Sequence, residues 1–184
     1  MDKGSLLAEY NKKIKRILIA EDEIRSAVKK AGAVIDDIYD GRPILLVSVL
    51  KGAFVFMADL CRAVSVPCEI AFMRVKSYYQ GTESSGEVKI VMDLDRNIEG
   101  CHVVIVEDIV DTGRTLNDLV KMLKARNPAS LKVITLLDKP SRRVVDFKAD
   151  MSLFTIPDYF VIGYGLDCGE EYRNLPYIAE YSAE

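Results

Sequence analysis

Residues 106–116 bring acidic, hydroxyl and glycine residues together in a stretch whose chemistry suits a sugar phosphate. They read VEDIVDTGRTL and follow an apolar run from His102 to Val106. Such a run predicts a strand buried on both faces of a parallel sheet, and residues 116–123 have the apolar spacing of a helix. We therefore expect a turn between the carboxyl end of a strand and the amino end of a helix.

A turn in this position can bind an anion. It presents backbone N–H groups that no acceptor within the helix satisfies, and these groups suit a phosphate. Thr112 and Thr115 add hydroxyl donors. Asp and Thr are also ordinary N-cap residues, so an acidic loop that only caps the helix is the alternative interpretation.

Glu107 and Asp108 place two carboxylates beside the expected phosphate turn. Two adjacent negative charges next to an anion site make electrostatic sense only if a cation or hydrogen-bond donors join them. Ribose hydroxyls and Mg²⁺ both qualify. Mg²⁺ prefers oxygen ligands, keeps several waters and is usually held by one or two carboxylates together with substrate phosphates.

The composition narrows the possible functions. A chain of 184 residues can form one domain with its own core. A formal net charge of -3 gives no basic surface for nucleic acid, and the longest apolar run, residues 44–50, is too short to cross a bilayer. Residues 1–15 have scattered charges and no apolar signal segment, so we expect a cytoplasmic protein that is neither secreted nor anchored.

The cysteines and the histidine exclude other common sites. The four cysteines have no CxxC spacing and only His102 could join them, so they do not form a zinc set and we expect reduced thiols. His102 would begin a buried strand, which favours a structural role over catalysis with a Ser or Cys nucleophile. A P-loop is also excluded, because no glycine is followed by Lys-Ser or Lys-Thr at the required spacing.

The expected elements alternate as in a parallel sheet with crossover helices. We expect strands at 16–19, 43–50, 68–75, 88–94, 102–106 and 132–137, and helices at 21–38, 53–64 and 116–123. A polar loop spans 77–86, and the chain beyond residue 137 is less regular. No linker or repeat divides it, so the sequence predicts an α/β fold in a single domain, 1–184.

The complete string at 106–116 resembles the phosphoribosyl pyrophosphate (PRPP) motif of type I phosphoribosyltransferases, in the form carried by the hypoxanthine-guanine branch. Further segments resemble that family in the same order along nearly the whole chain, from the first strand to Arg173. The resemblance implies a central, mainly parallel sheet flanked by helices, with a small hood formed largely by the terminal segments.

The resemblance implies how PRPP would be held. Thr112, Gly113, Arg114 and Thr115 would bind the 5′-phosphate, with Arg114 standing where a lysine is more familiar. Glu107 and Asp108 would bind the ribose hydroxyls. Backbone amides of the loop at Lys51 and Gly52, with a cis peptide bond before Lys51, would line the pyrophosphate pocket, and Arg173 would be the second pyrophosphate contact. Ser77 and Tyr78 would open a lid that excludes water from the reacting ribose. The expected Mg²⁺ ligands are Glu107, Asp108 and Asp167.

The resemblance also implies the base pocket. Lys139 matches the family lysine that donates to the purine O6, and an ammonium carries donors only, so it favours a 6-oxo group over the amino group of adenine. Phe160 resembles the aromatic residue that stacks on the purine. The backbone of Val161 would lie at the edge of the base, and Ile109 beside it. Hypoxanthine, guanine and xanthine remain alternatives.

Asp111 is the candidate for proton transfer, because the family places it beside N7 of the purine. An ordinary aspartate pKa of about 3.9 makes a poor general base. Apolar neighbours such as Ile109 and Val110 would raise that pKa; otherwise Asp111 would act chiefly as a hydrogen-bond acceptor. Both roles remain open at this point.

The activity implied is purine salvage: hypoxanthine or guanine and PRPP give IMP or GMP and pyrophosphate, with Mg²⁺ as cofactor. The family usually forms dimers or tetramers, so we expect a homodimer or homotetramer that binds neither nucleic acid nor membrane. The competing class is a regulatory module of the same fold that senses PRPP or nucleotides and binds nucleic acid. Such a regulator would carry a basic surface or a DNA-binding segment, and the sequence shows neither.

Overall fold

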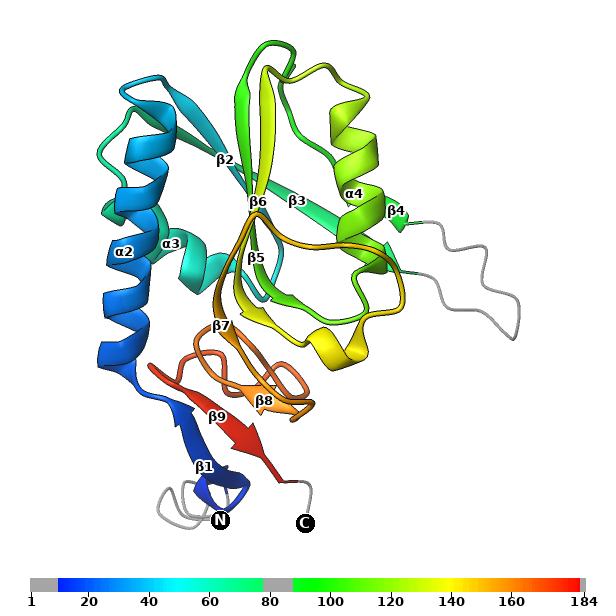
Figure 1. The fold of residues 1–184 in the computed structure, drawn as a ribbon. Helices are drawn as coiled ribbons and strands as arrows, with labels where there is room; N and C mark the ends of the chain where they lie inside the picture. The colour runs from blue at the N-terminus through cyan, green and yellow to red at the C-terminus, as the bar shows by residue number, and fades with distance from the viewer. Residues whose placement is uncertain (1–9, 78–87, 183–184) are drawn as a thin grey trace.

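The fold is organised around a six-stranded sheet with the order β4-β3-β2-β5-β6-β7 (Figure 1). The computed structural model describes residues 10–77 and 88–182. Five strands run parallel and β4 is antiparallel to its neighbour β3. This arrangement confirms the expected α/β class with a mainly parallel sheet. The strands are β2 (Ile44–Val49), β3 (Cys68–Ser77), β4 (Val88–Met92), β5 (His102–Val110), β6 (Ser130–Asp138) and β7 (Met151–Thr155).

Helices cover both faces of the sheet (Figure 1). The helices α2 (Glu21–Tyr39) and α3 (Phe54–Ala63) share one apolar cluster with side chains such as Leu46, Val104 and Leu136. The helix α4 (Arg114–Lys124) packs on the other face, where Leu116, Leu119 and Leu123 are buried. Their spacing of three and four residues gives one apolar stripe, which fixes the rotation of α4.

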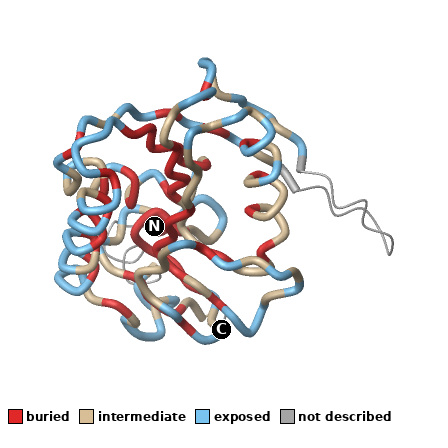
Figure 2. Tube along the Cα trace, turned by 45° about the horizontal axis from the view of Figure 1, so that its top comes forward, coloured by how far each residue is buried: buried red, intermediate tan, exposed pale blue. Residues whose placement is uncertain are grey.

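The central strands are buried on both sides because helices cover both faces. Every residue of β2 is buried, and so are residues 103–106 of β5. Figure 2 shows these buried stretches inside the molecule, whereas the helices alternate between buried and exposed residues. A strand covered on both faces has no need of polar alternation, which is why the sequence pattern identified β2 and β5 as continuous apolar runs.

A second, three-stranded antiparallel sheet has the order β1-β9-β8. Its strands are β1 (Ile14–Ile19), β8 (Val161–Ile162) and β9 (Ile178–Tyr181), so segments from near both ends of the described chain meet in it. In Figure 1 this sheet lies beyond the carboxyl ends of β5, β6 and β7. The short 3-10 helix η1 (Pro140–Arg142) follows β6 at the same end.

Two expectations about the strands were wrong. The strand expected at 102–106 continues to Val110, because Glu107 and Ile109 pair with Thr135 and Leu137 of the equally long β6. The acidic pair therefore lies in the strand and not in the turn. The strands β7, β8 and β9 were not expected. They are two to five residues long and depend on partners distant in sequence, so local pattern gives little sign of them.

No helix among the described residues has both the length and the apolar character required to cross a bilayer.

Asp36 joins α2 to the loop that follows α3. Its Oδ1 accepts hydrogen bonds from the N–H groups of Ser65 (2.8 Å) and Val66 (3.0 Å). Desolvation opposes ionisation of this carboxyl, but the two N–H groups outweigh it, so the pKa of Asp36 is lowered. The carboxylate therefore satisfies two backbone donors of the loop that follows α3.

We predict that Asp36→Ala lowers the free energy of unfolding by about 1 to 2 kcal/mol, because both backbone donors lose their acceptor. Urea unfolding at pH 7 measures the loss, and Asp37→Ala, an exposed neighbour on the same helix, is the control. A carboxyl with a depressed pKa stabilises the protein above its ordinary pKa, and that contribution disappears as the pH falls through the folded-state pKa. The difference between wild type and Asp36→Ala should therefore shrink below about pH 4; a constant difference would contradict this assignment.

Candidate active site

The candidate residues gather at the carboxyl ends of β2, β5 and β6. Open parallel sheets bind ligands at this edge, because the loops that leave neighbouring strands meet there. The loops after β5 and β6 are joined directly, since the N–H of Lys139 donates to the carbonyl of Val110 at 2.9 Å. Three loops that leave this edge, together with residues 165–173, supply most of the side chains expected from the sequence.

The expected turn between β5 and α4 is present and spans residues 111–113. Gly113 adopts a φ of 82°, a left-handed conformation that glycine accepts without strain, and α4 begins there without a side-chain cap. Thr112 Oγ1 accepts a hydrogen bond from the N–H of Arg114 at 3.4 Å. The turn thus places Thr112, Gly113, Arg114 and Thr115 around the amino end of α4, as a phosphate site requires.

Glu107 and Asp108 lie near the carboxyl end of β5, before Val110, in an environment that disfavours their charge. Desolvation, followed by the nearby charge of Asp108, raises the pKa of Glu107 well above its usual range. Desolvation also raises the pKa of Asp108 to about 6, although the N–H of Ile109 donates to its Oδ1 and opposes the shift. Glu107 Oε2 is closed to solvent and has no hydrogen-bond partner within the described part of the chain.

Asp108 lies against the loop of Gly52, which in turn lies against Gly165. A Cβ atom built on Gly52 would lie 1.5 Å from Asp108 Oδ2, and one built on Gly165 would lie 2.1 Å from the carbonyl oxygen of Gly52. Only residues without side chains fit this close approach. The peptide bond between Leu50 and Lys51 is cis, as the family resemblance predicted.

The two cations expected to bind pyrophosphate lie together. Lys51 Nζ and Arg173 Nη2 contact the same oxygen, Glu170 Oε2, at 2.9 and 3.2 Å. Arg173 Nη2 also pairs with Asp167 Oδ1 at 2.9 Å. A hollow of about 460 Å³ opens beside them, and its walls are formed by Leu50, Lys51, Phe54, Phe72, Glu170 and Arg173.

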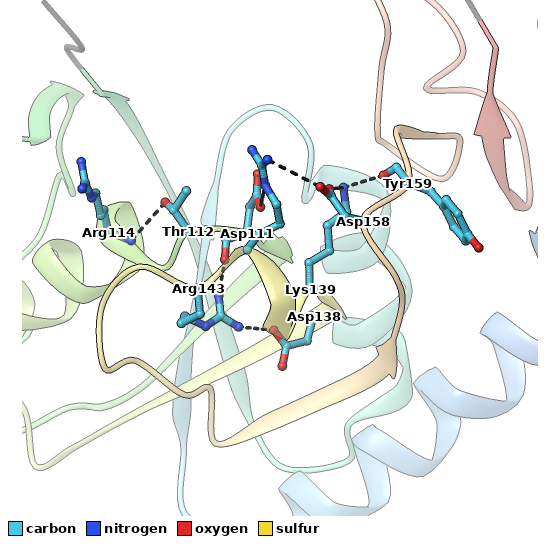
Figure 3. Close-up of polar contacts among 9 residues, drawn as sticks. Asp111, Thr112, Arg114, Asp138, Lys139, Arg143, Asp158 and Tyr159 are labelled. Carbon is cyan, nitrogen blue, oxygen red and sulfur yellow. Dashed lines mark hydrogen bonds and ion pairs between the residues drawn. The ribbon is translucent and has the colours of Figure 1, made fainter. Parts of the chain in front are cut away.

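Asp111 has a more exposed and more positive environment than the sequence suggested. Its carboxylate pairs with Arg142 Nε at 3.1 Å, and its side chain is 43% exposed. Arg143 donates to the carbonyl of Asp111 and pairs with Asp138 (Figure 3). Apolar neighbours therefore do not enclose this carboxylate. Arg142 and Arg143 were missed because a basic pair in an irregular segment carries no periodic signal.

Lys139 is a buried cation held by the segment before β8. Its residue is 8% exposed, and Nζ donates to the carbonyl of Tyr159 and lies 3.6 Å from Asp158 Oδ1 (Figure 3). Phe160 is 56% exposed and its ring packs at an angle against Tyr181, so the ring remains available for stacking. Val161 is buried in β8, whereas Ile109 is half-buried in β5.

The expected lid and the expected Mg²⁺ ligands are the remaining parts of the site. Ser77 is the last residue of β3, and Tyr78 lies outside the described residues, so the lid remains a prediction. Within residues 10–77 and 88–182, no three His, Cys, Asp or Glu side chains form a group that could hold a metal ion by themselves. The roles of Glu107, Asp108 and Asp167 toward Mg²⁺ therefore stay predictions.

His102 lies at the opposite end of β5 from the candidate site. Its Nδ1 is 2.8 Å from Ser130 Oγ, and its ring contacts that of Tyr39. These contacts agree with the structural role expected from the sequence. The four cysteines are free thiols, as expected.

Known proteins resemble this chain along nearly its whole length. The phosphoribosyl transferase domain family matches residues 10–168. The hypoxanthine-guanine phosphoribosyltransferase of Streptococcus pneumoniae is 50% identical over 171 residues, which cover 93% of this chain and 95% of that protein. The protein of the same name from Bacillus subtilis is 51% identical over 165 residues, with 90% and 92% covered.

Solved structures give the same result. A crystal structure of a hypoxanthine phosphoribosyltransferase from Staphylococcus aureus superposes with a TM-score of 0.91 at 43% identity, covering 98% of this chain and 97% of the other. A hypoxanthine phosphoribosyltransferase from Trypanosoma cruzi superposes with a TM-score of 0.88 at 48% identity, covering 92% of each chain.

The packing of the glycine loops generates a prediction about stability. Gly165 has a φ of 99° and Gly169 a φ of 62°, but a Cβ atom at Gly169 would meet nothing within 4 Å. We predict that Gly169→Ala costs about 1 kcal/mol, the usual penalty of the left-handed region. Gly165→Ala should cost at least about 2 kcal/mol more, because its Cβ also meets the backbone of Gly52. Urea unfolding of both variants measures this difference, and equal losses would contradict the close approach.

Proposed function

The chain belongs to the phosphoribosyl transferase family, and on this premise we propose that it is a purine-salvage enzyme. It transfers the phosphoribosyl group of PRPP to hypoxanthine or guanine and releases pyrophosphate. The products are IMP or GMP. Relatives about 50% identical bear the name hypoxanthine-guanine phosphoribosyltransferase, which supports this choice of base.

The meeting of three loops at one edge of the sheet is the observation that carries this proposal. PRPP presents a 5′-phosphate, a ribose diol and a pyrophosphate in series. The turn at residues 111–113, the acidic pair of β5 and the Lys51–Arg173 pair match that series, and Asp108 lies directly against Gly52 of the pyrophosphate loop. A regulatory module that senses PRPP could share this series, but the sequence shows neither the basic surface nor the DNA-binding segment expected of such a module.

Bond breaking in this reaction leaves positive charge on the anomeric carbon and negative charge on the leaving pyrophosphate. Lys51 and Arg173 bind the developing negative charge. Glu107 and Asp108 accept hydrogen bonds from the ribose hydroxyls and fix the ring while the base attacks. Held in this way, the anomeric carbon lies between the leaving group and the incoming base nitrogen.

Mg²⁺ fits the oxygen-only chemistry of the acidic pair, since Glu107 Oε2 is a buried acceptor without a partner in the described structure. Glu107, Asp108 and Asp167 would hold it together with phosphate oxygens, and when bound it would neutralise charge on the pyrophosphate.

Asp111 receives the role of hydrogen-bond acceptor at the purine. Its side chain is 43% exposed and pairs with Arg142 at 3.1 Å, and carboxylate oxygens accept hydrogen bonds. Of the two roles left open by the sequence, this environment supports the acceptor over a base whose pKa is raised by apolar neighbours.

Self-association as a homodimer or homotetramer is the remaining part of the proposal. Phe54, Ile70 and Phe72 are large apolar residues with exposed fractions above 40%. Ile70 and Phe72 point to the same side of β3, two residues apart, and Phe54 and Phe72 line the same hollow. Exposed apolar surface of this kind is typical of protein interfaces.

We predict that the wild type uses hypoxanthine and guanine but adenine at least about a hundredfold less well in kcat/KM. Replacing the 6-oxo acceptor of the base with an amino donor removes the hydrogen bond between Lys139 and the base. Lys139→Gln should narrow this gap, because its amide can keep a donor on the Tyr159 carbonyl and turn its oxygen toward the adenine amino group. The measurement is nucleotide formation from PRPP and each base with Mg²⁺, and excess EDTA should abolish it.

Lys148→Gln is the control for the base assay, since it makes the same change at an exposed lysine in the loop before β7. It should leave base preference unchanged. Adenine used as well as hypoxanthine by the wild type would remove Lys139 from base choice, and full activity in EDTA would remove the metal.

We also predict that Asp111→Asn lowers kcat by about a hundredfold or more while PRPP binding is retained, because the amide keeps the shape but loses an acceptor. Steady-state kinetics and PRPP binding are measured in parallel. Asp146→Asn, an exposed aspartate in the following loop, serves as control. Turnover within twofold of the wild type would exclude Asp111 from the role of hydrogen-bond acceptor at the purine.

A further inference from the structure

Glu170 occupies a position that none of the expected roles explains. Its Oε2 atom contacts both Lys51 Nζ, at 2.9 Å, and Arg173 Nη2, at 3.2 Å. These are the two cations assigned to pyrophosphate. A carboxylate oxygen bound by an ammonium and a guanidinium has the same contacts that a pyrophosphate oxygen would make.

Arg173 does not depend on Glu170 for its position. Its Nη1 donates to the carbonyl of Gly165 at 2.8 Å, and its Nη2 pairs with Asp167 Oδ1 at 2.9 Å. The arginine side chain is 17% exposed and is therefore also held by packing. Removing the Glu170 carboxylate leaves these contacts in place, so the guanidinium should remain where it is.

The backbone at Glu170 is also fixed independently of its side chain. Its N–H donates to Asp167 Oδ2 at 2.9 Å, and its φ is 72°. Cys168 and Glu171, which enclose it in the sequence, pair as an isolated antiparallel β-bridge. The Glu170 side chain is 63% exposed, so it can rotate into solvent without disturbing the loop.

The charge state of Glu170 agrees with this arrangement. Lys51, and after it Arg173, lowers the pKa of the Glu170 carboxyl below its usual value. The side chain is therefore a carboxylate near neutral pH, and it retains its negative charge when an anion approaches.

We propose that Glu170 is an internal competitor of pyrophosphate, which holds Lys51 and Arg173 by one carboxylate and must swing away when pyrophosphate binds. The inference rests on the proposed function for the identity of the anion. Glu170 weakens the binding of pyrophosphate, and of the same group in PRPP, and it favours release of the product by returning to the two cations as pyrophosphate leaves.

Competition is favoured over the alternative that Glu170 organises the cations for binding. Its pairs with Lys51 and Arg173 use the same side-chain atoms that pyrophosphate needs, whereas the contacts of Arg173 with Gly165 and Asp167 already orient the guanidinium. Pyrophosphate carries several negative charges and can replace one carboxylate at both cations. The cost of that exchange is the loss of two exposed ion pairs, each of which is individually weak.

The test is the affinity of the full-length protein for inorganic pyrophosphate, measured by titration calorimetry with Mg²⁺ present. Glu170→Gln should bind pyrophosphate roughly threefold to tenfold more tightly than wild type, as expected from removing two weak competing ion pairs. Stronger product binding should also strengthen inhibition of the transfer reaction by pyrophosphate by a similar factor.

Glu171→Gln is the matched control. It removes the same charge one residue away, from an exposed side chain that pairs with neither Lys51 nor Arg173. It should change affinity by less than about twofold. The gain in pyrophosphate affinity from Glu170→Gln should be smaller when the substitution is made in a Lys51→Ala variant than in the wild type. One of the two cations that Glu170 contacts is then missing.

Weaker or unchanged pyrophosphate binding by Glu170→Gln would overturn the proposal, and so would equal tightening by Glu171→Gln, which would indicate net charge alone. Absence of any pyrophosphate binding in wild type would also overturn it. The base assay separates this failure from that of the proposed function. If the wild type transfers to hypoxanthine but Glu170→Gln does not bind pyrophosphate more tightly, only the competition by Glu170 is refuted. If Glu170→Gln binds pyrophosphate more tightly but no purine is a substrate, the proposed reaction is refuted.

Discussion

The close approach of Gly52, Gly165 and the Asp108 carboxylate is the constraint on which the rest of the site depends. A Cβ atom on Gly52 would meet the Asp108 carboxylate, and one on Gly165 would meet the carbonyl of Gly52, so the loop after β2 packs against Asp108 on one side and against the loop after β8 on the other. Lys51 and Arg173, which belong to those loops, acquire fixed positions relative to the acidic pair. These two contacts, one with a carboxylate and one between backbones, thereby set the spacing between the pyrophosphate and ribose parts of the proposed site.

The end of β5 also separates carboxylates into two environments within five residues. Glu107 and Asp108 lie where desolvation raises the pKa of each, whereas Asp111 lies at the surface against Arg142. A desolvated carboxylate has few water contacts to lose, so it gains much from a hydroxyl donor or a cation. An exposed carboxylate beside arginine can accept a hydrogen bond from a donor on the base. The same residue type can therefore hold the sugar at one position and serve the base at another.

The sequence predicted the helices and the buried strands because their apolar periodicity is local and nearly complete. It could not place the end of β5, since the acidic pair interrupts the apolar run and only the ladder to β6 carries the strand to Val110. The strands β7, β8 and β9 could not be predicted for the same reason, since they depend on pairing with strands distant in sequence. Lys51, Lys139 and Arg173 were found through motif resemblance, whereas Glu170 and Arg142 were not, because their importance lies in contacts made by side chains distant in sequence.

Some site residues could be predicted from the sequence and others could not, because the parts of the proposed substrate require different kinds of contact. A phosphate and a ribose are recognised by backbone N–H groups and by residues at the ends of regular strands, so their sites share the periodicity of the sheet. A purine is recognised by its edge and face, which need side chains arranged around a flat ring. In the proposed site, Lys139, Phe160 and Asp111 supply these from segments outside the regular strands, and contacts with Tyr159, Tyr181 and Arg142 hold them. Base choice can thus change through a few loop residues while the sheet, the acidic pair and the glycine contact remain the same.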